Sequence, residues 1–167
     1  MFNLEQMKMM AALKAAMSGT DSVVDMPDGT KVRVQRSDEP GVRAVMRGES
    51  DGFEGRMFDA AETTPASYPS YLPFVAGTPA VVGSMRGESR FATWFGSLDV
   101  DSTLAMLVAH SERGGWVQAP SKAPPIPLPG LKTVTFRKGG FERVLLVGAF
   151  GGFGTASLID KAAEAVE

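Results

Sequence analysis

Apolar side chains recur in residues 1–18 with the three- and four-residue spacing of an amphipathic helix. On a helical projection they share one arc, with Glu5 and Lys8 off it, and Ser18-Gly19 ends the segment. The side chains on this arc are Phe2, Met9, Met10, Leu13 and Met17. Because methionine adapts to irregular surfaces, the stripe is a candidate contact for a partner protein or a second copy of the chain. The alternative is that it packs on the core of its own domain.

Strict alternation of apolar and polar side chains then predicts strands in the first half of the chain. Residues 23–36 form a candidate hairpin around Pro27-Asp28-Gly29, and residues 41–48 continue the alternation. Residues 59–79 break it with several prolines and glycines. We expect this stretch to be an irregular connection and the place where the domain would subdivide.

The second half predicts a clearer order of elements. Strands are expected over residues 80–87 and 90–97, followed by a helix over 99–115 that begins at an aspartate and ends at glycines. A hairpin over 131–148 follows, and a final helix would carry Leu158, Ala162, Ala165 and Val166 on one face.

These elements together predict an α+β fold. It would be a mainly antiparallel sheet with an N-terminal amphipathic helix (1–18) and two helices in the second half. Residues 19–167 would form a single domain, subdivided at most near 60–79. The segment Met46–Ser50 recurs as Met85–Ser89, which leaves an internal duplication or a chance match open.

Composition excludes several chemistries. The chain has 167 residues, 44% hydrophobic and 22% charged, which is typical of a globular protein. It contains no cysteine and one histidine, so thiol chemistry and cysteine- or histidine-pair metal sites are excluded. A net charge of −2 predicts no general attraction to nucleic acid. The sequence shows neither a signal peptide nor a transmembrane run, so we expect a cytoplasmic protein.

Part of the second half resembles a known module. Gly115-Trp116 and the hairpin Thr135–Gly140 are similar to features of uncharacterised bacterial envelope proteins, many of them lipoproteins. The similarity spans residues 80–150 and implies a strand, a helix, a Gly-Trp pair and a hairpin. The chain departs from that pattern in lacking a lipoprotein signal and its cysteine. The resemblance implies a bacterial protein of this fold and no activity.

The glycine cluster near the end imitates a nucleotide-binding loop. Gly148, Gly151 and Gly154 follow an apolar run, but too few residues remain for the second strand and acidic residue of a dinucleotide fold. A weaker anion site is still open, in which backbone N–H groups at a helix start bind phosphate. Its residues would be Gly151, Gly152, Gly154 and Thr155. The alternative is a purely structural turn.

The remaining histidine, aspartate and arginine residues do not predict a catalytic centre, a metal site or a cofactor site. His110 has no evident orienting carboxylate, and its neighbours Ser111 and Glu112 project in other directions on a helix. Asp99 and Asp101 fit a helix start. The arginines of the first half, Arg33, Arg43, Arg47 and Arg56, are expected to form a solvated sheet face, because no aromatic residues alternate with them to stack on bases. The alternative is a local basic patch on one face of the sheet.

Aromatic residues cluster in and after the proline-rich connection. Tyr68, Tyr71 and Trp94 are candidate partner contacts, since tyrosine and tryptophan are enriched in binding hot spots. The alternative is that they fill the core and pin the loop. We therefore expect a non-enzymatic interaction or assembly subunit, binding a protein partner or itself. The alternative is a small-ligand or phosphate-binding domain that uses the glycine-rich turn.

Overall fold

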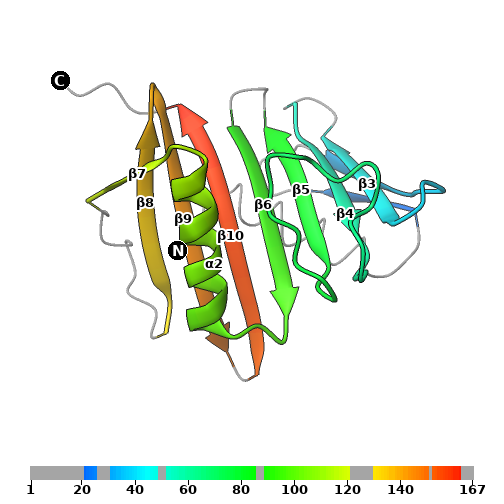
Figure 1. The fold of residues 1–167 in the computed structure, drawn as a ribbon. Helices are drawn as coiled ribbons and strands as arrows, with labels where there is room; N and C mark the ends of the chain where they lie inside the picture. The colour runs from blue at the N-terminus through cyan, green and yellow to red at the C-terminus, as the bar shows by residue number, and fades with distance from the viewer. Residues whose placement is uncertain are drawn as a thin grey trace.

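The computed structural model describes residues 21–25, 31–48, 52–85, 89–120, 130–150 and 152–162. In this part of the chain it forms one ten-stranded antiparallel sheet and one helix (Figure 1). The strands are β1 (Ser22–Asp25), β2 (Lys31–Arg36), β3 (Val42–Gly48), β4 (Glu54–Phe58), β5 (Ala80–Met85), β6 (Ser89–Gly96), β7 (Val117–Ala119), β8 (Lys132–Lys138), β9 (Phe141–Phe150) and β10 (Phe153–Ala162). The helix, α2, spans Val100–Arg113.

The strands follow chain order across the sheet except at one crossover. The spatial order is β1-β2-β3-β4-β5-β6-β10-β9-β8-β7. After β6 the chain passes through α2 to the far edge of the sheet, and then returns strand by strand until β10 pairs with β6. The last strand therefore lies in the middle of the sheet, between β6 and β9.

The expected α+β fold with three helices is wrong. The described residues are mostly antiparallel sheet, and the predicted final helix is strand β10. Its side chains alternate with the period of a strand, because Gly154, Ala156 and Leu158 are buried while the residues between them are partly exposed. Pairing with strands on both sides outweighs the helical spacing of the apolar residues. The predicted N-terminal helix, residues 1–18, lies outside the described residues.

Several local predictions are confirmed. Helix α2 is capped at its start by Asp99, whose carboxylate accepts a hydrogen bond of 3.0 Å from the backbone N–H of Ser102. Hydrogen bonds from the side chain of Ser102 and from its backbone N–H lower the pKa of Asp99. The helix ends at Gly114, and Gly115 follows with a φ of +88° that favours glycine. Strands β8 and β9 form the predicted hairpin.

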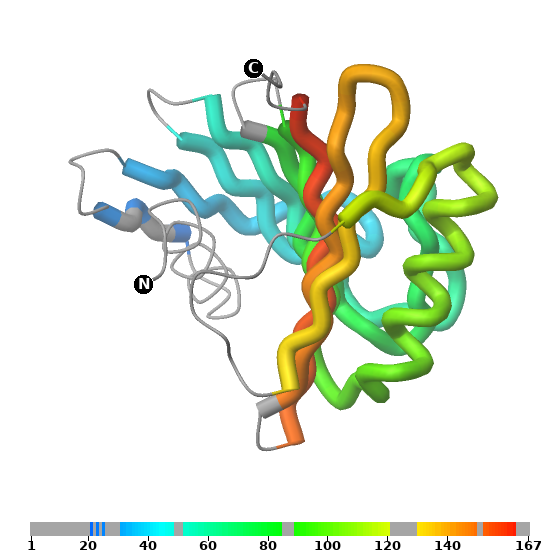
Figure 2. The backbone as a smooth tube through the Cα atoms, turned by 90° about the vertical axis from the view of Figure 1, so that its left-hand side faces the viewer, coloured from blue at the N-terminus to red at the C-terminus, as the bar shows by residue number. Residues whose placement is uncertain are grey.

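Each face of the sheet carries a core. The helix face is the one covered by α2 and by residues 59–79, which lie on the same side of the sheet (Figure 2). Its core includes Trp94, Leu107, Phe136, Leu145 and Leu158. The opposite face has a second core of Val32, Val34, Met46, Phe53 and Phe91, in which the two phenylalanine rings stack 6.0 Å apart. Strand alternation accounts for both cores, because successive side chains point to opposite faces.

The connection between β4 and β5 is pinned to the helix face by aromatic residues. The hydroxyl of Tyr68 donates to the carbonyl of Pro73 at 2.6 Å and accepts from the indole of Trp94 at 3.3 Å. Trp94 is only 1% exposed. Trp94, a candidate partner contact from the sequence, therefore lies in the helix-face core. Tyr68 is partly buried and packs against that core, with its hydroxyl paired to the indole of Trp94. The partner contact expected at Tyr68 stays a prediction.

Candidate functional site

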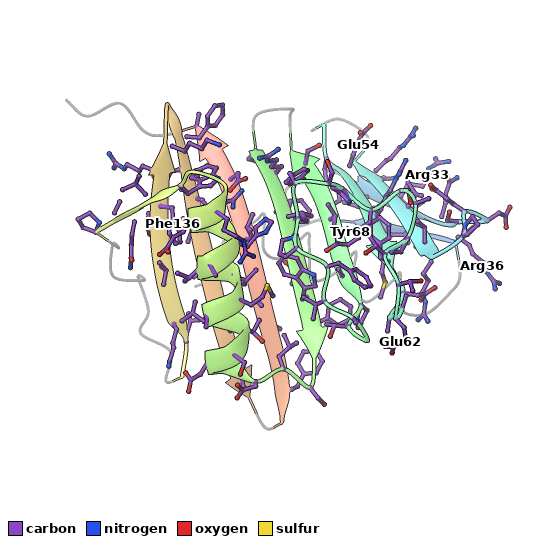
Figure 3. All side chains as sticks on the ribbon, in the orientation of Figure 1. Arg33, Arg36, Glu54, Glu62, Tyr68 and Phe136 are labelled. Atoms are coloured by element: carbon purple, nitrogen blue, oxygen red, sulfur yellow. The ribbon has the colours of Figure 1, made fainter. Side chains whose placement is uncertain are left out.

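One cross-strand row of residues crosses the helix face, and Figure 3 labels three of its members, Arg33, Glu54 and Phe136. From β1 to β7, the residues in register are Val23, Arg33, Arg47, Glu54, Ser84, Arg90, Asp160, Arg143, Phe136 and Gln118. We call the part from Arg33 to Arg143 the charged row. Its four arginines and two acids leave a formal charge of +2 on a chain whose net charge is −2. The row is thus a cationic strip on an acidic protein.

One end of the charged row is a buried ion pair between Arg143 and Asp160. Arg143 is 2% exposed and Asp160 is 4% exposed. The guanidinium of Arg143 binds both carboxylate oxygens, with Nε to Oδ1 at 2.7 Å and Nη2 to Oδ2 at 2.9 Å. Its third nitrogen donates to the buried hydroxyl of Ser111 on α2 at 3.2 Å, and its carbon lies 4.3 Å from the ring centroid of Trp116. Helix and sheet are therefore joined through this guanidinium.

Arg90 forms the outer half of the cluster. Its Nε donates to Oδ2 of Asp160 at 3.0 Å, and its guanidinium carbon lies 3.8 Å above the ring centroid of Tyr71. The side chain is 44% exposed. Its two terminal amino groups make no hydrogen bond to any residue that the structure describes. Asp160 and Tyr71 thus hold a planar set of donors toward solvent, the geometry that recognises carboxylate or phosphate.

A cleft of about 670 Å³ opens beside Arg90. Its walls include Asp160, Lys138, Trp116 and Phe141, together with Ser84 and Ser89. The ammonium of Lys138 donates to the carbonyl of Gly114 at 2.6 Å, so the end of α2 holds it in place. Phe141 is 55% exposed, which is high for a large apolar side chain. The cleft therefore presents cations, hydroxyls and an exposed aromatic ring together.

A second cleft of about 390 Å³ follows the charged row in the other direction. It is lined by Arg47, Glu54, Arg56 and Tyr71, and it shares Ser84 and Arg90 with the first cleft. Arg47 stands directly opposite Arg33 in the β2–β3 register. Two cations therefore lie side by side at this end of the charged row.

No family model, no curated protein and no solved structure matches this chain. The resemblance of residues 80–150 to the envelope-protein module stays a prediction. Among the described residues, no helix is long and apolar enough to cross a membrane.

Three of the residues predicted to bind an anion, Gly152, Gly154 and Thr155, lie in the β9–β10 hairpin. Gly152 has a φ of +85° at the turn, and Gly154 pairs with Ala149 inside the β9–β10 ladder. Thr155 faces Gly148 in the same ladder, and Gly151 lies outside the described residues. The helix start on which the anion prediction rested is absent here, because residues 153–162 are strand. Their backbone groups are used by the sheet.

The other predicted residues fall in different places. Tyr71 lines the second cleft, and it is the one aromatic candidate that contributes to the site. Nε2 of His110 lies 3.0 Å from the carbonyl oxygen of Tyr71, so this imidazole contacts the connection that carries the tyrosine. Within the described ranges, no group of three or more acidic or histidine residues could hold a metal. The methionine-rich stripe, from Phe2 to Met17, lies outside those ranges and stays a prediction.

Sequence reasoning did not single out Arg90, Asp160 or Arg143. A signal was present for two of them. In β9, Arg143 lies on the same buried face as Leu145 and Val147. In β10, Asp160 lies on the same buried face as Leu158. A charged residue on the buried side of a strand needs a partner, and each of these is the partner of the other.

The two tyrosines provide a pH test of this geometry. Burial raises the pKa of both Tyr68 and Tyr71 above 10.0 and outweighs the opposing charge of Arg90 beside Tyr71. The folded state therefore favours the protonated phenols, and this contribution to stability is complete below pH 10 and lost as pH rises through the native pKa values. We expect tyrosinate absorbance of the native protein to appear at higher pH than in denaturant. Native and denatured titrations that coincide would contradict the burial of these rings.

Proposed function

We propose that the protein is a non-enzymatic binding protein that recognises a carboxylate or phosphate group at Arg90. The proposal retains the interaction or ligand-binding role expected from the sequence and moves it from the glycine-rich turn to the charged row. The observation that carries it is the guanidinium of Arg90, which is oriented by Asp160 and Tyr71 beside a cleft and whose terminal amino groups bind none of the described residues.

The surroundings of Arg90 favour an anion. The negative charge of Asp160 is already shared by two arginines, so it does not neutralise Arg90 alone. Lys138 adds a further cation on the same cleft wall. A bound oxyanion would accept hydrogen bonds from donors that are held in place before binding, which reduces the entropy lost on association.

The proposal is tested by replacing Arg90 with glutamine. Citrate, glutarate and inorganic phosphate are titrated into the protein at low salt and followed by calorimetry. Because a hydrogen bond to a charged group contributes about 1.5–3 kcal/mol, R90Q is expected to weaken binding about tenfold or more. Binding to the unaltered protein should also fall as salt is raised.

The matched control is R137Q. Arg137 is an exposed arginine on β8 next to Lys138, but alternation turns it to the opposite face of the sheet. R137Q removes the same charge as R90Q, but on the face of the sheet away from Arg90. It should therefore leave the affinity for the anion nearly unchanged. Equal losses in R90Q and R137Q would show only a general charge effect, and an unchanged affinity in R90Q would refute the proposal.

A further inference from the structure

We propose that the two clefts form one groove across the strands, which binds an extended peptide segment bearing two acidic side chains separated by three residues. This inference rests on the proposed anion recognition at Arg90 and identifies the kind of molecule that bears the anionic group. Arg90 and Ser84 belong to both clefts, so the two hollows meet at the centre of the charged row.

The spacing of the cations sets the spacing of the acids. Arg47 and Arg90 lie three strands apart along the row, through Glu54 and Ser84. Neighbouring strands are about 4.8 Å apart, so the two positions are separated by about 14 Å. An extended peptide advances about 3.3 Å per residue, so side chains four positions apart are separated by about 13 Å and point to the same side.

The residues between the cations exclude a continuous acidic run. Glu54 stands between Arg47 and Ser84 in the register, and it lines the second cleft. A carboxylate bound over it would be repelled, whereas a neutral side chain can hydrogen-bond to the hydroxyl of Ser84. The groove therefore favours two separated acids over a block of them.

The same groove is poorly suited to single-stranded nucleic acid. Binding of that kind uses aromatic rings on which bases stack. Here the ring of Tyr71 stacks with Arg90 and the ring of Trp116 stacks with Arg143, so Phe141 is the one exposed ring among the described residues of the two clefts. Glu54 also places negative charge in the path of a phosphate backbone. An acidic peptide fits this pattern of charges better.

The test uses two fluorescein-labelled peptides of identical composition, measured by fluorescence anisotropy. One has two aspartates separated by three glycine or alanine residues, and the other has the two aspartates adjacent. The unaltered protein is expected to bind the spaced peptide about tenfold more tightly, because only that peptide reaches both cations. R47Q should remove this preference, R90Q should weaken both peptides, and R137Q should change neither.

The outcomes separate this inference from the proposed function. If R47Q keeps the preference, or the unaltered protein shows none, the groove is refuted while citrate binding that depends on Arg90 still supports the anion site. If R90Q alters neither citrate nor peptide binding, both proposals fail. A short oligothymidylate that binds more tightly than the spaced peptide would also overturn the peptide assignment. Circular dichroism and thermal melting of each variant verify that the fold is retained.

Discussion

Replacing Asp160 with asparagine is expected to lower the free energy of unfolding by about 3–5 kcal/mol, because it leaves a buried guanidinium without its counter-charge. The carboxylate accepts two hydrogen bonds from Arg143 and one from Arg90, and it is almost fully buried. An amide in its place would also turn an N–H group toward arginine donors. Urea denaturation of D160N and the unaltered protein measures the difference.

The control for this prediction is D101N. Asp101 also forms an ion pair, with Lys132, but its side chain is 80% exposed. Exposed pairs contribute about 0–1 kcal/mol, so D101N should be close to the unaltered protein. The double variant R143M/D160L should lose less stability than the two single variants together, because either single change already leaves a buried charge unpaired. Additive losses would mean that Arg143 and Asp160 are not coupled.

The second large effect is expected at Gly83 on β5. A Cβ atom there would lie 2.2 Å from the backbone oxygen of Glu54 and 2.9 Å from the ring of Phe91. The first contact is with backbone of the paired strand, so a side-chain rotation cannot relieve it. We expect G83A to lose about 3 kcal/mol, at the upper end of the usual cost of overpacking.

G140A is the matched control for G83A. Gly140 lies in the β8–β9 turn, and a Cβ atom there would have no atom within 4 Å. Its stability should stay within about 0.5 kcal/mol of the unaltered protein, as for other surface substitutions. Equal stabilities for G83A and G140A would show that β4 and β5 do not approach as closely as described.

The elements that could be predicted from the sequence are those set by caps, turn residues and alternation among neighbouring residues. Helix α2 was predictable because Asp99 caps its start and two glycines follow its end. The β8–β9 hairpin was predictable because alternating residues flank Gly139 and Gly140. The inward position of Arg143 was also readable, as a charged residue on the apolar side of the alternation in β9, but its pairing with Asp160 was not.

Strand β10 shows the limit of local patterns. The apolar residues after the glycine cluster, from Leu158 onward, fit a helical face, while Ala156 and Leu158 equally fit the alternation of a strand. The choice was made by β6 and β9, which pair with this segment along both sides. One of those strands is remote in the chain, since Arg90 and Asp160 are 70 residues apart.

The sequence by itself determined where most strands and helix α2 form, because alternation, caps and turn residues act over a few neighbouring positions. The tertiary structure alone decided that the last described segment is a central strand. It also decided that residues from separate strands share the charged row, because that row exists only through the register of each pair. A shift of one residue in any pair would send the arginines beyond it to the opposite face, since side chains alternate with a period of two.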